Sequence, residues 1–103
     1  TKQWKNLSTG WRMSYKLELT RLAFENVKKL KSEEPKAYFK FLKLSAELKE
    51  HPTTGTGKPE YLKYDPRGVW SRRITKKHRM IYKILDDQVI VQIISAYGHY
   101  GDK

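Results

Sequence analysis

His99 has the most unusual setting of the three histidines, because it lies in the near-terminal segment YGHYGDK, apart from His51 and His78. An imidazole exchanges a proton near neutral pH, so His99 is the best candidate for a catalytic proton carrier. The alternative, which composition alone favours, is an exposed histidine in a tail. Glu60 is a second candidate, a lone carboxylate directly after Pro59 in a basic stretch. Its alternative role is an ordinary surface ion pair.

Three arginines in the same stretch could bind phosphate groups: Arg72, Arg73 and Arg79. A guanidinium presents a fork of N–H donors that matches phosphate oxygens, although these side chains could equally keep a strand face soluble. Trp70 and Tyr82 could stack on bases, but aromatic residues in strands more often lie in the core. We therefore assign Trp70 and Tyr82 to packing.

Metal and nucleotide chemistry lack their usual motifs in this sequence. It contains no HExxH, no paired CxxC, no Gly-rich loop that opens a helix and no clustered Asp triad, which argues against zinc hydrolysis, nucleotide binding and two-metal nuclease chemistry. With no cysteine, it also has no disulfide, thiolate ligand or cysteine nucleophile. We therefore expect any catalysis to use neither a metal ion nor a cofactor.

The charge of the chain points to a nucleic-acid partner. Lys and Arg exceed Asp and Glu by eleven, and the pI is about 9.9. Between residues 58 and 83 there are nine basic and two acidic residues. Such a patch attracts phosphates with strong salt dependence, and its alternative role is a basic surface that keeps the protein soluble. Charge alone does not distinguish an enzyme from a binding module.

The first half of the chain predicts one strand and two helices. Residues 15–20 alternate apolar and polar side chains as a half-buried strand does, and Thr20 suits a helix N-cap. Apolar spacing predicts a first helix over 21–31, and Pro35 suits the first turn of a second helix that ends near Glu50. The apolar stripes of the two helices consist of Ala23, Phe24, Val27 and Leu30, and of Tyr38, Phe41, Leu42, Ser45 and Leu48.

The second half predicts a loop, HPTTGTGKPE, and then strands. Four stretches read as strands: 61–64, 69–74, 78–85 and 88–95. Turns at 75–77 and 86–87 are too short to join parallel strands, so we expect an antiparallel four-stranded meander and an α+β fold. Arg72 and Arg73 must point to opposite faces of their strand. One face is then the core, and the other can carry a basic groove.

The length of 103 residues indicates a single domain. The longest apolar stretch, residues 89–94, is far shorter than the ~20 residues that span a bilayer, and the first 16 residues lack the apolar run of a secretory signal. We therefore expect a cytoplasmic protein without a membrane partner, which also fits the absence of cysteine.

The stretch from Gly57 to Val91 resembles the YoeB/Txe family of toxins within the RelE superfamily. It carries the family motifs GKPE-x-L-K, G-x-W-S-R-R-I and H-R-x-x-Y in order, and the pair His99 and Tyr100 completes the set. The resemblance implies a small RelE-like domain over residues 15–103, with residues 1–14 as an N-terminal extension of unknown role. Gly101, Asp102 and Lys103 depart from the shortest family members, which end at the equivalent of Tyr100.

The resemblance also implies an endoribonuclease that cleaves messenger RNA on the ribosome, with a YefM/Axe-like antitoxin as partner. The sequence leaves open whether the toxin is a monomer or a homodimer. By motif, Glu60 is the general base, Arg79 stabilises the phosphate, His99 is the general acid and Tyr100 positions the RNA. Lys63 and Arg73 match further basic positions of the family's active site, and with Arg72 they make up the expected substrate-binding set. The products are a 2′,3′-cyclic phosphate and a 5′-hydroxyl.

Two alternatives compete with this reading. A ParE-like toxin shares the superfamily fold but acts on DNA gyrase and lacks this acid-base set, so Glu60, Arg79 and the pair of His99 and Tyr100 weigh against it. A plain RNA-binding module recognises ribosomal RNA without cutting it. Analysis of the products formed on programmed ribosomes separates the three.

Overall fold

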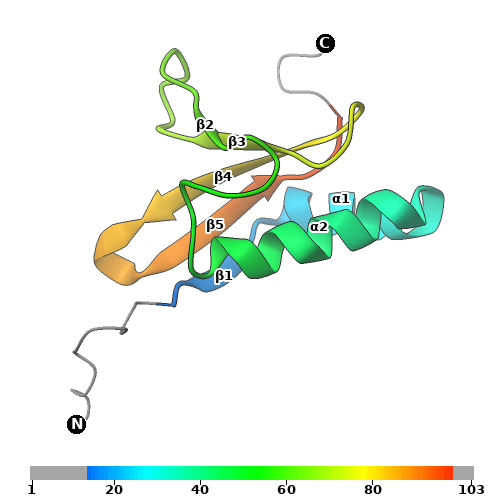
Figure 1. The fold of residues 1–103 in the computed structure, drawn as a ribbon, viewed down its shortest axis with the longest axis horizontal. Helices are drawn as coiled ribbons and strands as arrows, with labels where there is room; N and C mark the ends of the chain where they lie inside the picture. The colour runs from blue at the N-terminus through cyan, green and yellow to red at the C-terminus, as the bar shows by residue number, and fades with distance from the viewer. Residues whose placement is uncertain (1–13, 99–103) are drawn as a thin grey trace, which may run out of the picture.

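The computed structural model describes residues 14–98, in which two helices lie together on one side of a twisted sheet (Figure 1). In chain order the elements are β1 (Lys16–Leu19), α1 (Arg21–Glu33), α2 (Pro35–Leu48), β2 (Glu60–Tyr61), β3 (Trp70–Arg73), β4 (Arg79–Leu85), the 3₁₀ turn η2 (Asp86–Gln88) and β5 (Ile90–Ser95). The predicted order of one strand, two helices and four strands is confirmed.

The helices begin where local sequence signals predict. The Thr20 hydroxyl accepts the Ala23 N–H at 3.1 Å as the N-cap of α1, and it donates to the Ile94 carbonyl at 2.7 Å. Glu34 separates the helices, and Pro35 occupies the first turn of α2, where a missing N–H has no cost. Neither helix is long and apolar enough to cross a membrane within residues 14–98.

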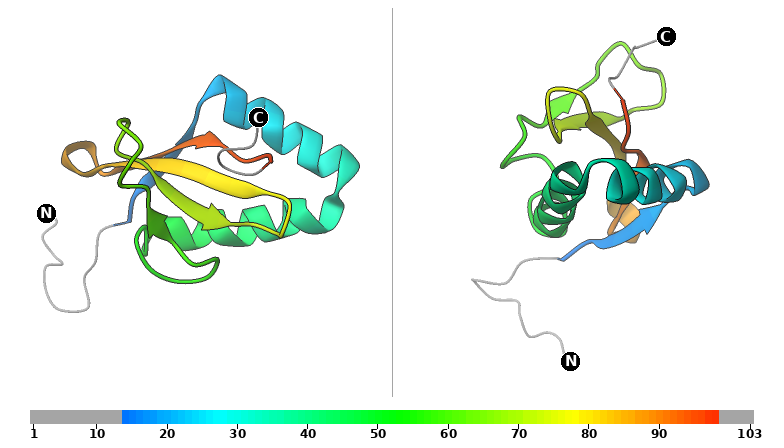
Figure 2. Two further views of the ribbon diagram at one scale, coloured as in Figure 1. Left: turned by 90° about the horizontal axis from the view of Figure 1, so that it is seen from above. Right: turned by 90° about the vertical axis from the view of Figure 1, so that its right-hand side faces the viewer.

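The sheet has the strand order β1-β5-β4-β3-β2, so the first strand of the chain, β1, lies next to the last, β5 (Figure 2). β1 runs parallel to β5, with Lys16 opposite Ile90. The other pairs are antiparallel, because their connections are too short for a crossover. The antiparallel meander and the α+β class are therefore confirmed.

The core fills the space between the helices and one face of the sheet. Its buried members are Ala23, Leu30, Ala37, Phe41, Leu44, Leu48, Ile74, Met80, Tyr82, Val91, Ile93 and Ala96. Two predictions were wrong, since Phe24 and Leu42 are 55% and 43% exposed. Successive helical residues point about 100° apart, so Ala23 packs inward while the adjacent Phe24 ring turns outward. In α2, Leu44 and Ala37 are buried instead of Leu42.

The predicted strand over 61–64 is shorter in the structure, because β2 pairs only at Glu60 and Tyr61. The chain turns immediately afterwards. Leu62 donates its N–H to Val69 at 3.0 Å and accepts the Asp65 N–H at 3.0 Å. The Asp65 carboxylate then accepts from both the backbone and the guanidinium of Arg67, which closes the turn.

Candidate active site

The sheet face that points away from the helices gathers side chains from three strands; we call it the outer face. Glu60 on β2 lies opposite Ser71 on β3, and Ser71 lies opposite Ile81 on β4. Arg73 lies opposite Arg79 in the next pair along the same strands. Residues directly opposite each other, and every second residue along a strand, share a face. The register therefore brings Glu60, Arg73 and Arg79 together.

Ser71 connects the carboxylate side of the outer face with the arginine side. The Arg79 guanidinium donates from Nη1 to the Ser71 hydroxyl at 3.1 Å, and Ser71 is 1% exposed. This bond fixes the direction of a long side chain while the guanidinium stays partly exposed. Sequence reasoning missed Ser71, although strict alternation in WSRR already puts it on the same face as Arg73.

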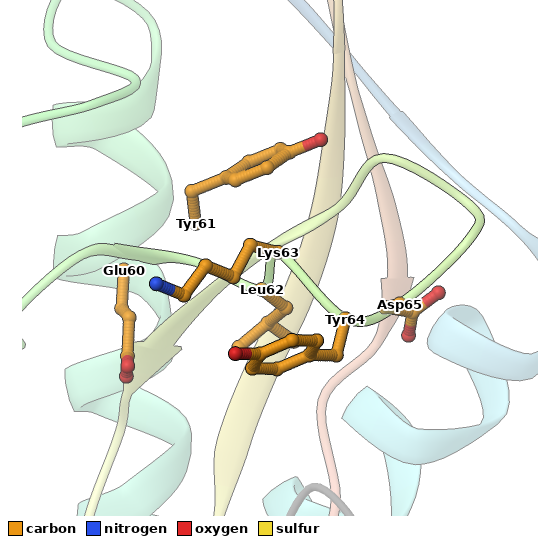
Figure 3. A pocket seen from close by; sticks show the side chains of 6 residues that line it. All are labelled: Glu60, Tyr61, Leu62, Lys63, Tyr64 and Asp65. Atoms are coloured by element: carbon orange, nitrogen blue, oxygen red, sulfur yellow. The ribbon is translucent and has the colours of Figure 1, made fainter.

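Glu60 forms part of a pocket of about 180 Å³ that residues 60–65 line. Figure 3 shows the Lys63 side chain extending toward Glu60, with the Tyr64 ring beneath it. The Lys63 ammonium lies 5.7 Å from the centre of the Tyr64 ring, which is 91% exposed. No residue between 14 and 98 engages the Glu60 carboxylate in a hydrogen bond or ion pair. The cation and the open aromatic face suit a polyanionic, base-bearing ligand, and the accessible carboxylate beside them is a candidate proton acceptor.

Arg72 does not belong to this site, which corrects its expected role in substrate binding. It is 0% exposed and points to the helix side of β3, while Arg73 points outward. Its guanidinium donates to Glu47 at 3.0 Å and to the carbonyls of His51 and Thr54 at 2.9 and 2.8 Å. Those bonds, and the absence of exposure, leave it no access to a phosphate. The opposite orientation of the two arginines is confirmed.

The buried Arg72 instead holds the loop that leads to Glu60. Glu47 accepts from the backbone and the hydroxyl of Thr56 at 2.9 and 2.7 Å. These bonds, and then the charge of Arg72, hold the pKa of the Glu47 carboxyl below its usual value. Gly57 has φ +88°, and a Cβ there would meet the Arg72 side chain at 2.7 Å. The glycine lets the loop pass close over the arginine before the chain reaches β2.

The expected catalytic pair, His99 and Tyr100, lies outside the described residues. The chain that leads to it ends next to the outer face, because the Arg79 N–H donates to the Gly98 carbonyl at 2.8 Å. Gly98 has φ +82°, a conformation that glycine adopts readily. Residue 98 is therefore fixed alongside the arginine that begins β4.

The two aromatic residues that we assigned to packing both contribute to the core, Tyr82 as a buried member and Trp70 as a half-buried residue packed against it. Tyr82 is fully buried and donates its hydroxyl to the Pro52 carbonyl at 2.7 Å. Burial raises the pKa of the Tyr82 hydroxyl. Trp70 packs against the core from β3 and meets the edge of the Tyr61 ring, with centroids 5.6 Å apart.

Chemically, the outer face combines a group that can accept a proton with groups that can stabilise an anion. Glu60 is the acceptor, and Arg79, Arg73 and Lys63 supply positive charge. Within residues 14–98, no cluster of three or more His, Asp or Glu side chains has the arrangement of a metal site. These side chains can act as a base and can stabilise an anion, which are two of the roles that phosphoryl-transfer chemistry uses.

Comparison with known sequences identifies relatives. Residues 19–100 match the family model described as a YoeB-like toxin of bacterial type II toxin-antitoxin systems. Toxin YoeB of Streptomyces coelicolor is 48% identical over 58 residues, which are 56% of this chain and 67% of the relative. Toxin YoeB of Synechocystis is 34% identical over 85 residues, which are 82% of this chain and 96% of the relative. The match to Toxin YoeB of Escherichia coli spans 62% of that relative, less than two thirds of its length.

Solved structures show the same fold. The YoeB/ParE toxin from Agrobacterium tumefaciens has a TM-score of 0.77 and 33% identity, over 82% of this chain and 99% of that one. The Staphylococcus aureus YoeB dimer has a TM-score of 0.73 and 32% identity, over 84% and 99% of the two chains. In the heterotetrameric YoeB-YefM complex from the same organism the values are 0.71 and 31%, over 84% and 98%. This chain therefore belongs to the family of YoeB-like toxins of bacterial type II toxin-antitoxin systems.

Proposed function

We propose that this toxin is a metal-independent endoribonuclease that cleaves messenger RNA on the ribosome and so inhibits translation. The observation that carries the proposal is the outer face, where Glu60 and Arg79 come from different strands and both adjoin Ser71. A lone carboxylate and a clamped guanidinium, held on one face of a rigid sheet, match the needs of RNA cleavage by an internal nucleophile.

The reaction needs only proton transfer and charge stabilisation. Glu60 removes the proton from the ribose 2′-hydroxyl, and the 2′-oxygen attacks the adjacent phosphorus. Arg79 stabilises the negative charge that develops on the phosphoryl oxygens. The bond between phosphorus and the 5′-oxygen breaks, and His99 protonates the leaving oxygen. The products are a 2′,3′-cyclic phosphate and a 5′-hydroxyl, and no step requires a metal ion or cofactor.

The remaining groups bind and orient the RNA. Lys63 and Arg73 contact backbone phosphates from the two sides of Glu60, and Tyr100 positions the nucleotide at the cleavage site. We add Tyr64, whose exposed ring beside the Glu60 pocket suits stacking on a base. Arg72 has no part in this set, since it holds the preceding loop instead.

The family membership supports a partner as well as an activity. YoeB of Staphylococcus aureus forms a heterotetrameric complex with YefM and is also known as a dimer. We propose that a YefM/Axe-like antitoxin neutralises this toxin, that two copies can associate, and that both proteins act in the cytoplasm. The net charge of +11 favours rapid association with an acidic antitoxin.

Bridging sulfur substrates test the assigned roles. In a short RNA that has sulfur in place of the leaving 5′-oxygen, the sulfur departs without a proton. This substrate therefore bypasses the general acid. On ordinary RNA, His99→Ala, Glu60→Ala and Arg79→Ala should each lose about 10²- to 10⁴-fold in cleavage rate. On the sulfur substrate, only His99→Ala should recover most of its activity. The assay contains excess EDTA, because the scheme uses no metal ion.

Each outcome separates the candidates. Rescue of Glu60→Ala instead would reverse the acid and base assignments, and rescue of neither would make Tyr100 the candidate acid. Activity lost in EDTA and restored by Mg²⁺ would contradict the acid-base scheme. Intact messenger RNA after incubation with programmed ribosomes would favour the alternatives, a ParE-like toxin or a plain binding module.

A further inference from the structure

His78 is a buried histidine that the proposed mechanism does not use. It lies between the 75–77 turn and β4, is 1% exposed, and has partners at both ring nitrogens. Nε2 lies 2.8 Å from the Glu34 carboxylate at the corner between the helices. Nδ1 lies 2.9 Å from the backbone nitrogen of Gly98. One side chain thus touches the helix corner and the residue before His99.

The partners determine the tautomer of the His78 ring. A backbone N–H can only donate, so Nδ1 must accept from Gly98, and the ring proton must sit on Nε2, where it is donated to Glu34. The Tyr97 ring packs against the imidazole with centroids 4.5 Å apart. The His78 backbone N–H donates to the Thr75 hydroxyl at 3.2 Å, so both the backbone and the side chain of His78 are hydrogen-bonded.

Gly98 is held at both of its polar backbone groups by two consecutive residues. His78 receives its N–H through the side chain, and Arg79 donates its own N–H to the Gly98 carbonyl at 2.8 Å. The Arg79 guanidinium is in turn directed by Ser71. The arrangement therefore joins the start of β4 to the peptide unit from which His99 begins.

We propose that His78 is a positioning residue that sets where the chain to His99 and Tyr100 leaves the sheet, relative to Arg79. The inference rests on the proposed function, because its catalytic readout is RNA cleavage. Misplacement of a catalytic group by about 1 Å can cost 10²-fold in rate. We call the hydrogen bond from the Gly98 N–H to His78 the Gly98 clamp. Because it holds the backbone one residue before the general acid, its loss can misplace that group although His78 does not touch the substrate.

Two substitutions of His78 separate the two ring nitrogens. In His78→Asn, the amide oxygen lies near the position of Nδ1, so it can still accept the Gly98 N–H while the bond to Glu34 is lost. In His78→Gln, the amide nitrogen lies near the position of Nε2, so it can still donate to Glu34 while the Gly98 N–H loses its acceptor. Both variants lose the ring that packs on Tyr97, so the loss of that contact is common to them.

The clamp predicts a split between these variants. The kcat for a short RNA should fall roughly 10- to 100-fold in His78→Gln and about threefold or less in His78→Asn. KM should change little in either, because the phosphate contacts on the outer face remain. Equal kcat losses in the two variants, or a larger loss in His78→Asn, would overturn the proposal.

Hydrogen exchange of the Gly98 amide provides a readout that does not depend on catalysis. In the wild-type toxin this amide should exchange as slowly as strand amides, and its protection should survive in His78→Asn but not in His78→Gln. A freely exchanging Gly98 amide in the wild type overturns the clamp even if neither variant folds. If the wild type cleaves no RNA but shows the protected amide, the proposed function fails and not the clamp. If protection follows the pattern but kcat does not, the positioning role is wrong.

Discussion

Two neighbouring arginines of β3 lie on opposite faces of the sheet and differ in their burial and in their hydrogen-bond partners. On the inner face, Arg72 is fully buried, and its donors go to Glu47 and two loop carbonyls. On the outer face, Arg73 is exposed, and its neighbour Ser71 is bonded to Arg79 across the pair of strands. A guanidinium whose donors are taken by the protein stabilises the fold. One whose donors are open can bind a ligand.

The inner face also shows what a buried cation requires. Removing a charge from water carries a large desolvation cost, which attraction to an opposite charge and further hydrogen bonds must offset. Arg72 obtains both, although its Nε has no partner among the described residues. The guanidinium carbon of Arg72 also lies 5.8 Å from the centre of the Tyr82 ring, in the range of a cation–π contact. The difference between the faces lies in these partners and not in residue type.

The two arginines should differ most in what they contribute to the stability of the fold. Arg72→Met should lower the free energy of unfolding by roughly 3 kcal/mol, because the Glu47 carboxylate loses its charged partner and the loop loses its donors. Arg73→Met, the same chemical change on the outer face, should alter it by less than about 0.5 kcal/mol. Urea denaturation measures both. Equal losses in the two variants would show that burial of Arg72 does not distinguish the faces.

RNA binding should show a smaller difference, which depends on the outer face. Arg73→Met should weaken binding of a short single-stranded RNA about tenfold at low salt. It should also reduce the slope of log affinity against log salt by about 0.7, the value for one lost phosphate contact. Lys36→Met, which removes an exposed charge from α2 instead, is the matched control. If this control weakens binding as much, the RNA responds to net charge and not to the outer face.

The smallest expected effect is a pH dependence of stability that arises from the ion pair on the inner face. The Thr56 hydrogen bonds and Arg72 lower the pKa of Glu47 below its ordinary value of 4.5. The ionised carboxyl therefore stabilises the fold above about pH 4.5, and this contribution is lost as the pH falls through the lower pKa of the folded state. In urea unfolding from pH 6 to 3, Glu47→Gln should show a flatter stability profile than the wild type.

Some pH dependence should remain in Glu47→Gln. His78 and Lys77 lower the pKa of Glu34 in the same way, at the corner between the helices. A second substitution, Glu34→Gln, should flatten the profile further. An unchanged profile in Glu47→Gln would mean that the inner ion pair contributes nothing that depends on its charge.

Local sequence signals determined the elements and their order. Thr20 and Pro35 mark helix starts because capping and the missing proline N–H act within one turn. Alternation of side chains predicted that Arg72 and Arg73 point to opposite faces, and short turns predicted antiparallel pairing. The motifs named Glu60, Lys63 and Arg79 as candidates, and their roles, like those of His99 and Tyr100, remain predictions.

Only the tertiary structure decided which arginine is buried and which side chains meet. Arg72 is inside because Glu47 and the Thr54 carbonyl, 25 and 18 residues away, converge on it. Ser71 meets Arg79, and His78 meets Gly98, only once the strand register is set. Because side chains alternate along a strand, the sequence predicts that neighbouring residues point to opposite faces. The positions of distant partners decide which of the two side chains is buried and which is exposed to water. A buried polar group needs partners, and only the assembled fold provides them.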